Sequence, residues 1–423
     1  MAFASALAGR DGPQDLRSGD WLLIGSLYIT QFLGLGFFVT ALAAILRQAG
    51  APLSQVGMIY MLGLVWPLKP LWAPLIDRFG FGRFGHYRGW LILLQTLMVL
   101  ALLILSFFSV IEHFSIVYAL CLFVSLASAT QDIAVDALAC RLVPPARRGF
   151  ANGIQVAGGL IGNLLGGGAT LVAYPFLGWR GCMVILAAST CLPLLQLLRF
   201  REPPSGLQKA SMPDVYKRAW SFWRSLPSPL WIALLIVFPI GNGLAYGILT
   251  PMLTDGGWPL EQTGFVVNGL GSLCGLVCAL ATGWLVGRFG RRRMLVSAAF
   301  LQVLGVAAMA LPAFGGTSLV SGTVAALLFF CSYNPASTVL ATLMMDHCSP
   351  RSPGTDYTLQ NSASQIVSIS MMMAATALAI PIGYGGVVIL ASILALLAAL
   401  LSLAYRTDSS RHGTAQGLPQ QVA

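Results

Sequence analysis

The chain has 423 residues, of which 57% are hydrophobic and 9% are charged, whereas about a quarter of the residues of an average soluble domain are charged. Because 24 basic and 14 acidic side chains are too few to cover a folded chain of this length in water, the composition excludes a water-soluble globular enzyme. The net charge of +10 does not indicate a nucleic-acid-binding protein, since the basic residues lie between apolar runs, and an integral membrane protein is predicted.

The predicted elements are twelve membrane-spanning helices, identified as apolar segments bounded by charged residues, glycine or proline. Six precede the longest polar stretch of the chain and six follow it, so we expect an all-α integral membrane fold of two six-helix halves. The first six spans are residues 21–46, 55–76, 89–110, 114–139, 150–173 and 180–199. The second six are residues 229–253, 261–286, 294–312, 318–345, 357–380 and 384–405.

The segments outside the spans complete the predicted organisation. Residues 1–20 and 406–423 form polar tails, residues 21–199 and 229–405 form the two halves, and residues 200–228 form a linker. Lys and Arg in short loops stay on the cytoplasmic side of a membrane. With the N-terminus inside, 21 basic residues fall in cytoplasmic segments and two fall in outer loops. Both termini and the linker are therefore expected in the cytoplasm.

One loop sequence occurs twice in the chain. The segment 77–83 (Asp-Arg-Phe-Gly-Phe-Gly-Arg) ends the second predicted span, and the segment 287–293 (Gly-Arg-Phe-Gly-Arg-Arg-Arg) ends the eighth. A repeat of two like-oriented halves is typical of alternating-access transporters, whose substrate site lies near the middle of the membrane. The two loops resemble the loop signature of the major facilitator superfamily, which implies the twelve-helix fold of that superfamily.

A narrower resemblance rests on the segments 68–78, 130–137 and 354–360, with the string 131–136 (Gln-Asp-Ile-Ala-Val-Asp) as its most specific part. These segments are similar to the branch that includes the AmpG muropeptide permeases, the acetyl-CoA transporters and the rhizobactin/pyochelin siderophore permeases. In length the chain looks more like the siderophore permeases. The resemblance implies a permease of the bacterial inner membrane that imports a siderophore or its ferric complex, with a muropeptide or acetyl-CoA as the alternative cargo.

Charged side chains within the predicted spans are candidate functional groups, because a charge in lipid is costly unless it is paired or hydrated. Lys69 is a candidate ligand for an anionic substrate; the alternative is an ion pair or a stem that extends to the membrane surface. Asp132 and Asp136 are four residues apart and share one helix face, with Gln131 beside them. We expect Gln131 and Asp132 to bind substrate and both aspartates to couple transport to protons, since neighbouring carboxylates favour protonation of one.

Two other arrangements of these charges remain open. Lys69 can pair with Asp132 across the second and fourth spans, and Asp136 can pair with a loop arginine.

The repeated loops supply a candidate gate, in which an aspartate at a helix end contacts a neighbouring helix in one of two conformations. In the second copy a topological anchor is favoured, because the aspartate is absent. The candidate gating residues are Asp77, Arg78, Gly80, Arg83, Arg147 and Arg288.

Polar residues of the second half are further candidates for substrate binding. Unsatisfied amides and hydroxyls are costly in lipid, so these side chains either line a cavity or hydrogen-bond between helices. The two tyrosines can stack on a planar ligand, or they can pack as ordinary aromatic side chains. The candidates are Asn242, Tyr246, Tyr333, Asn334 and Gln360.

The fifth predicted span carries glycine at positions 158, 162 and 166. Small residues at this spacing let two helices pack closely, so we expect a helix–helix contact there. Exporters of the resembled superfamily carry a proline within this run, and its absence favours import over drug export.

The sequence therefore predicts a secondary transporter, namely a proton symporter that imports an organic anionic solute. Its expected partners are a small-molecule substrate, protons and the lipid bilayer, and the chain is taken to act as a monomer. We expect no cofactor and no metal, since the four histidines are isolated and no phosphate-binding loop occurs. An enzyme is therefore not predicted. A membrane sensor without net transport is the alternative of another class, but only 18 residues follow the last span.

Overall fold

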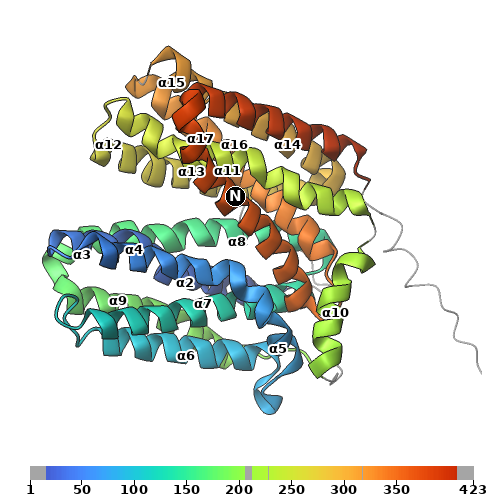
Figure 1. Cartoon of the computed structure of the whole chain (residues 1–423). Coiled ribbons are helices and arrows are strands. Elements are labelled where there is room, and N and C mark those ends of the chain that lie inside the picture. Colours follow the sequence, from blue (N-terminus) through green and yellow to red (C-terminus); the bar gives the residue numbers. More distant parts are fainter. Residues whose placement is uncertain (1–15, 205–211, 227, 317, 407–423) are drawn as a thin grey trace, which may run out of the picture.

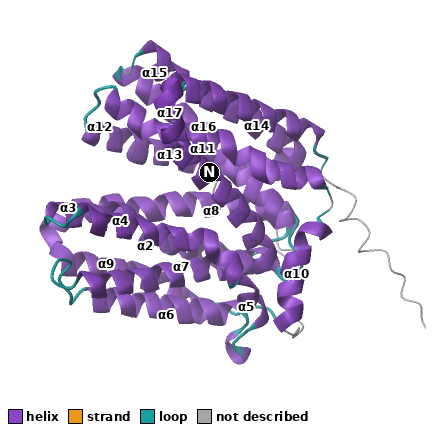
Figure 2. Ribbon diagram, viewed as in Figure 1, coloured by secondary structure: helices purple, strands orange, loops and turns teal. Residues whose placement is uncertain are grey.

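The structure is a computed structural model that describes residues 16–204, 212–226, 228–316 and 318–406. Within those residues all regular elements are helices, and Figure 2 shows only helices and loops. Most of the predicted tails, 1–20 and 406–423, lies outside the described residues, as does the part of the predicted linker between residues 205 and 211. The all-α prediction is confirmed for the described part of the chain.

The first group of helices extends from residue 18 to residue 199 and is coloured blue to green in Figure 1. Two π-helical turns, η1 and η5, are inserted into otherwise continuous helices, and a 3₁₀ segment, η2, replaces the middle of the second predicted span. The elements are α2 (Ser18–Gly36), η1 (Phe37–Leu42), α3 (Ala43–Gln48), α4 (Leu53–Met61), η2 (Leu62–Leu71), α5 (Ala73–Arg78), η3 (Gly82–Phe84), α6 (Tyr87–Leu105), α7 (Phe114–Leu142), η4 (Pro145–Arg147), α8 (Arg148–Asn163), η5 (Leu164–Ala169) and α9 (Thr170–Arg199).

The second group of helices extends from residue 229 to residue 404, and the separate helix α10 (Met212–Ser225) precedes it. A further π-helical turn, η6, interrupts the eighth predicted span, and a turn at residues 308–309 divides the ninth. The elements are α11 (Pro229–Asp255), α12 (Leu260–Gly264), η6 (Phe265–Leu270), α13 (Gly271–Phe289), α14 (Arg291–Ala307), α15 (Ala310–Gly315), α16 (Leu319–Asp346) and α17 (Pro353–Ala404).

Nine helical segments of the described residues are long and apolar enough to cross a membrane, whereas the sequence predicts twelve spans. Two of the nine have 55 and 52 residues, far more than the roughly 20 that one crossing requires. Each contains a glycine with a positive φ angle, Gly178 at +62° and Gly383 at +68°, where the helical path breaks. The predicted span 55–76 is not among the nine, because Pro67 and Pro70 lie in a 3₁₀ segment that divides it into short pieces.

The two groups of helices approach each other at one end of the molecule. In Figure 1 their ribbons lie apart near α3 and α12 and close together near α10. Between the groups, α8 contacts α13 and α16, and the first part of α17 contacts α5, η2 and α7. One cluster of buried apolar side chains includes Leu138, Leu343 and Tyr357 and so joins both groups, while two other large clusters each stay within one group. The α10 end is therefore the packed end of the interface.

The glycines of the fifth predicted span pack against α2, as expected from their spacing. A Cβ atom added at Gly158 would lie 2.8 Å from the Cβ of Tyr28, and one added at Gly162 or Gly166 would overlap a backbone carbonyl oxygen of α2. The predicted close contact is thus confirmed, and no side chain fits at these positions. Its partner, however, lies in the same group of helices.

A second glycine contact joins the two groups themselves. A Cβ added at Gly153 of α8 would lie 2.8 Å from the carbonyl oxygen of Ala279, and one added at Gly283 of α13 would lie 2.6 Å from that of Gly149. The backbones of α8 and α13 therefore meet directly across the interface. We call this contact, formed by residues Gly149, Gly153, Ala279 and Gly283, the glycine seam.

Candidate transport site

The charged residues predicted within the second and fourth spans lie in direct contact. The Nζ atom of Lys69 on η2 donates a hydrogen bond to Oδ2 of Asp132 on α7, and both side chains are buried, with 0% and 3% of their surface exposed. Gln31 of α2 donates from Nε2 to the other oxygen, Oδ1, at 2.7 Å. The Lys69 ammonium also lies 4.9 Å from the ring centre of Trp66. Both oxygens of Asp132 thus accept a hydrogen bond, and the pair is shielded from solvent.

The position of Lys69 follows from the prolines on either side of it. Pro67 and Pro70 cannot donate backbone hydrogen bonds, so an α-helix is disfavoured through this stretch, and the chain adopts the tighter 3₁₀ form over Leu62–Leu71. This segment packs against α7, which carries Asp132. Trp72, just beyond it, donates from Nε1 to the hydroxyl of Thr130 at 3.1 Å and ties the same two elements together.

A set of amides extends the buried site into α2 and α6. Gln95 donates to Oε1 of Gln131 and to the hydroxyl of Thr30, both at 3.0 Å, and Gln131 donates to the carbonyl oxygen of Leu27 at 3.0 Å. The Oε1 atoms of Gln31 and Gln95 are buried without a hydrogen-bond partner among the described residues. Gln31 and Gln95 are absent from the sequence prediction, although each is a polar residue within a predicted span. We call Gln31, Lys69, Gln95, Gln131 and Asp132 the buried polar cluster.

Asp136 lies one helical turn from Asp132 and connects to the second group of helices. Its Oδ1 accepts hydrogen bonds from the hydroxyl of Tyr28 at 2.9 Å and from Nε2 of Gln155 at 2.8 Å, while Oδ2 is buried without a partner among the described residues. The hydroxyl of Tyr357 on α17 donates to Oε1 of Gln155 at 2.8 Å. In this conformation Asp136 forms no ion pair with an arginine of the described residues, so the alternative pairing with a loop arginine is not observed here.

Asp77, the first predicted gating residue, contacts the beginning of α17. Its Oδ1 accepts from the backbone N–H of Gly354 at 3.1 Å, and its Oδ2 accepts from that of Thr355 at 2.7 Å. The hydroxyl of Tyr87 adds a third bond at 2.7 Å. A carboxylate at a helix N-terminus is stabilised both by the free N–H groups and by the helix dipole. The first loop copy is thereby joined to the second group of helices.

The other predicted gating residues lie near the same end. Arg78 and Arg83 are positioned over the ring of the phenylalanine that follows each of them, at 5.3 and 4.9 Å. A Cβ added at Gly80 would lie 2.5 Å from Nδ1 of His86, so only glycine fits there. Arg147 and Arg288 line one small cavity of about 410 Å³ between α8 and α13.

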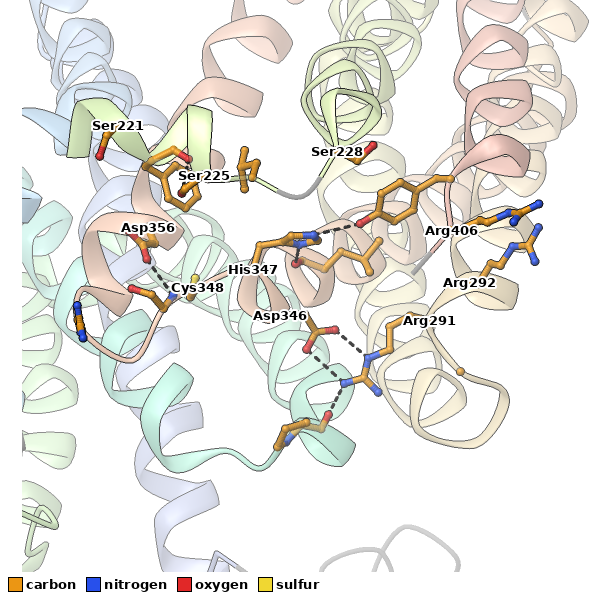
Figure 3. Close-up of a pocket in the computed structure, with 18 of the residues that line it drawn as sticks. Ser221, Ser225, Ser228, Arg291, Arg292, Asp346, His347, Cys348, Asp356 and Arg406 are labelled. Atoms are coloured by element: carbon orange, nitrogen blue, oxygen red, sulfur yellow. Dashed lines mark hydrogen bonds and ion pairs between the residues drawn. The ribbon is translucent and has the colours of Figure 1, made fainter. Parts of the chain in front are cut away.

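An ion-pair group around Asp346, the acidic residue that follows the tenth predicted span, also joins the two groups of helices. Asp346, at the end of α16, accepts from Nη1 of Arg148 at 3.0 Å and from Nε of Arg291 at 2.8 Å. Arg148 begins α8 in the first group, and Nη2 of Arg291 donates to the carbonyl oxygen of Pro145 (Figure 3). The only sequence signal for this group is the acid itself, which follows the tenth predicted span and does not reveal its partners.

The predicted tyrosines of the second group form an aromatic face. Tyr246 and Tyr333 lie 6.1 Å apart with their ring planes at 26°, and Phe329 stacks on Tyr333 at 5.7 Å. Both tyrosines are only partly buried, whereas Phe329 is fully buried. A planar group could stack on this face, since offset aromatic pairs tolerate such an addition.

The predicted amides of the second group are distributed differently. Gln360 is fully buried, donates to the carbonyl oxygens of Met344 and Asp356, and accepts from Nε1 of Trp231, so it bridges three helices. Asn334 donates to a carbonyl oxygen of its own helix. The Oδ1 atom of Asn242 is buried without a partner among the described residues. Of the three amides, Asn242 is therefore the one whose side-chain oxygen is available to accept a hydrogen bond from a substrate.

The sequence is similar to those of several bacterial permeases and putative transporters. The chain is 28% identical over 369 residues to the anhydromuropeptide permease of Escherichia coli K12, an alignment that covers 84% of this chain and 72% of the relative. It is 24% identical over 396 residues to the putative transporter AmpG 4 of Rickettsia felis, covering 90% of this chain and 95% of that protein. Neither relative is named for a siderophore, so the siderophore resemblance is not supported.

Solved structures of the same fold are also found. The human organic anion transporter MFSD10 (TETRAN) superposes with a TM-score of 0.71 at 16% identity, covering 93% of this chain and 100% of that chain. A variant of the Escherichia coli fucose:proton symporter FucP superposes with a TM-score of 0.67 at 12% identity, covering 92% and 99%. At this level of identity the likeness establishes the fold alone.

The family itself is shown by the match to its sequence model. Residues 24–372 match the family described as the Major Facilitator Superfamily, which is most of the chain and includes the buried polar cluster. The superfamily consists of membrane permeases rather than enzymes, in agreement with the relatives above. The chain is a multi-pass membrane transporter that belongs to the Major Facilitator Superfamily.

Proposed function

We propose that the chain is a monomeric, proton-coupled importer of the bacterial inner membrane, built from twelve spans in two six-helix halves with both termini in the cytoplasm. Breaks at Gly178 and Gly383 divide the two longest helical segments into lengths that suit two crossings each. The stretch from Leu53 to Arg78 supplies a further crossing in three pieces. The bacterial relatives support the inner membrane as the location.

The observation that carries proton coupling is the pair of carboxylates beside a buried ammonium. Lys69 neutralises Asp132, while Asp136, one turn away, has one oxygen with no donor among the described residues. That oxygen can accept a proton without breaking the hydrogen bonds made by the other oxygen. Because Gln155 hydrogen-bonds to both Asp136 and Tyr357, a change of charge at Asp136 is transmitted through Gln155 to a contact between the two halves.

The leading substrate is a muropeptide or a related sugar–peptide, which is the kind of solute for which the Escherichia coli relative is named. The buried polar cluster suits such a solute, since the unpaired Oε1 atoms of Gln31 and Gln95 are acceptors for hydroxyl and amide groups. A siderophore is the second candidate, and one observation favours it: the partly exposed Tyr246–Tyr333 pair matches a planar catecholate or phenolate.

The experiment is uptake into proteoliposomes that contain the full-length purified chain, with an imposed pH gradient. Radiolabelled anhydromuropeptide and a radiolabelled ferric siderophore are offered separately and in competition. Gradient-dependent accumulation of the muropeptide supports the proposal. Accumulation of the siderophore alone transfers the function to the second candidate, and accumulation of neither contradicts both.

The coupling role is tested with Asp136→Asn and with Asp20→Asn as the matched control, because Asp20 is a partly exposed carboxylate at the start of α2 that accepts only a local hydrogen bond from the backbone of Arg17. The Asp136 variant should lose accumulation driven by the pH gradient and keep the exchange of labelled for unlabelled substrate. The control should keep both. Equal loss of accumulation and exchange at Asp136 would show that it binds substrate or supports the fold rather than carrying the proton.

A further inference from the structure

A large cavity outside the transport site lies at the packed end of the molecule, beside α10 (Figure 3). Its volume is about 1400 Å³. The wall consists of α10, the first turn of α14, the segment between α16 and α17, and the end of α17. We call it the arginine chamber, because six arginines line it: Arg218, Arg291, Arg292, Arg293, Arg351 and Arg406.

Among the described residues, carboxylates compensate only part of the positive charge of the arginine chamber. Two aspartates line it, and Asp346 is already engaged by Arg148 and Arg291. Asp356, in the first turn of α17, accepts hydrogen bonds from the residues just before that helix, from the backbone N–H of Ser349 at 2.9 Å and from the hydroxyl of Ser352 at 3.0 Å. Four of the arginines have no carboxylate of the described residues within 4 Å: Arg292, Arg293, Arg351 and Arg406.

The first turn of α14 adds to this imbalance. Three arginines in succession, Arg291 to Arg293, begin the helix directly after Gly290, and the turn contains no acidic residue. A helix N-terminus carries partial positive charge and free N–H groups, so it favours an anion and disfavours cations. Asp346 pairs with Arg291, whereas the exposed Arg292 and Arg293 have no carboxylate partner among the described residues, so an added anion is favoured at this helix start. The helix start and the arginine side chains thus point to the same kind of ligand.

Hydroxyl groups and a fixed ring complete the lining. Ser221, Ser225 and Ser228 come from α10 and the residues after it, on the side of the chamber opposite Arg291 (Figure 3). His347 forms part of the wall, stacked on Trp231 at 4.6 Å and hydrogen-bonded to the hydroxyl of Tyr405 at 3.1 Å. Hydroxyls can donate to or accept from a phosphoryl group according to need, and the stacked histidine keeps the wall in place.

Membrane topology alone does not account for the chamber. The rule that places Lys and Arg in cytoplasmic loops requires basic residues at this end of the molecule but does not require them to surround one cavity. Arg83, Arg199 and Arg201 belong to the same predicted side and lie outside the chamber lining. The concentration of six arginines around one space therefore calls for a second explanation.

We propose that the arginine chamber is a binding site for a phosphate-bearing anion, separate from the transport site. Guanidinium groups bind phosphoryl oxygens through paired hydrogen bonds, and several can engage one group from different sides. The phosphate is supplied either by the headgroup of an anionic lipid or by a soluble phosphorylated compound. One wall is α10, in which Tyr216 donates a hydrogen bond to Leu71 of the first group and Arg218 donates one to Ser349 of the second. An anion bound in the chamber therefore affects how α10 connects the two groups.

The experiment uses the full-length chain and two probes. Pyrophosphate binding is measured by calorimetry on protein in nanodiscs of phosphatidylcholine. Lipid retention is measured by native mass spectrometry on delipidated protein supplied with equal amounts of phosphatidylglycerol and phosphatidylcholine. The chamber variant is Arg293→Gln with Arg351→Gln, and the matched control is Arg199→Gln with Arg201→Gln, which removes the same charge outside the chamber. Arg406→Gln, at the end of α17, is a second chamber variant.

The wild-type chain and the control should bind pyrophosphate or retain phosphatidylglycerol selectively. The double chamber variant should lose at least about tenfold in affinity, the factor expected for one hydrogen bond to a charged group, and Arg406→Gln should change it in the same direction. An effect on pyrophosphate alone identifies a soluble ligand, and an effect on phosphatidylglycerol alone identifies a lipid headgroup. Absence of binding by the wild type, or equal losses in the chamber and control variants, overturns the proposal.

Discussion

The contact between Lys69 and Asp132 allows a quantitative test of the buried polar cluster. The perturbation is a double-mutant cycle of Lys69→Met, Asp132→Asn and the two combined. Met preserves the length of the lysine stem without its charge, and Asn preserves an oxygen that can accept from Gln31. Each single variant leaves one charge or one strong acceptor buried without its partner, whereas the double variant removes both charges at once.

The size of the expected destabilisation follows from the burial of Lys69 and Asp132. Lys69 is 0% exposed, and its one hydrogen-bond acceptor among the described residues is Asp132. Removing one partner of a buried pair typically costs about 3–5 kcal/mol, because the remaining charge is uncompensated, while removing both is often close to neutral. Each single variant should therefore destabilise the protein by about 3–5 kcal/mol, and the double variant should be more stable than either.

The assay is thermal unfolding followed with a thiol-reactive fluorescent dye, since the chain has eight free cysteines and those at positions 121 and 182 are buried in the first group of helices. The expected order of melting temperature is wild type, then the double variant, then the two single variants. Losses that simply add in the double variant would refute the reasoning, because they would show that the two side chains do not stabilise each other.

Three further predictions concern the interface and the packing. Asp77→Ala should favour separation of the packed end by roughly 3 kcal/mol, the worth of two hydrogen bonds to a charged group; spin-label distances between α5 and α17 should lengthen, and unchanged distances would contradict this. Tyr357→Phe removes the hydroxyl bond to Gln155 and should lower thermal stability by only about 1 kcal/mol while increasing the rate of substrate exchange; a slower exchange would count against a gating contact. Gly166→Ala should destabilise the protein by at least about 2 kcal/mol in the same unfolding assay. Gly168→Ala should not, because its added Cβ would lie 3.5 Å from the nearest atom, Cδ1 of Leu164; equal effects would contradict the packing argument.

Apolar windows locate the helices better than they locate the breaks between them. The predicted span 114–139 corresponds to α7, and 318–345 to α16, because charged or turn residues bound these runs on both sides. The span 55–76 contains two prolines, but local sequence cannot show whether proline kinks an α-helix or shifts it to 3₁₀ geometry. By contrast, the gaps predicted at residues 174–179 and 381–383 contain the bends at Gly178 and Gly383, where the turns are so short that helix continues on both sides.

The site is predictable where charge is involved and less so where amides are. Lys69 and Asp132 are conspicuous in an apolar stretch, so their pairing is one of the arrangements that the sequence leaves open. Gln31 and Gln95 are uncharged and do not stand out in the sequence, although they complete the cluster. The partners of Asp136 depend on how α2, α7, α8 and α17 come together, and this three-dimensional arrangement is not encoded in the spacing along any one helix.

The glycine seam between α8 and α13 determines which interactions resist separation of the two groups at their packed end. Because backbone faces backbone at the seam, parting α8 from α13 at these four residues exposes little interlocked side-chain surface. Resistance to separation then depends on the apolar cluster that joins both groups and on directional polar bonds, namely those of Asp77, Asp346 and Tyr357. An interface of this kind can open when one of these polar groups changes its charge, while the packing within each group of helices stays intact.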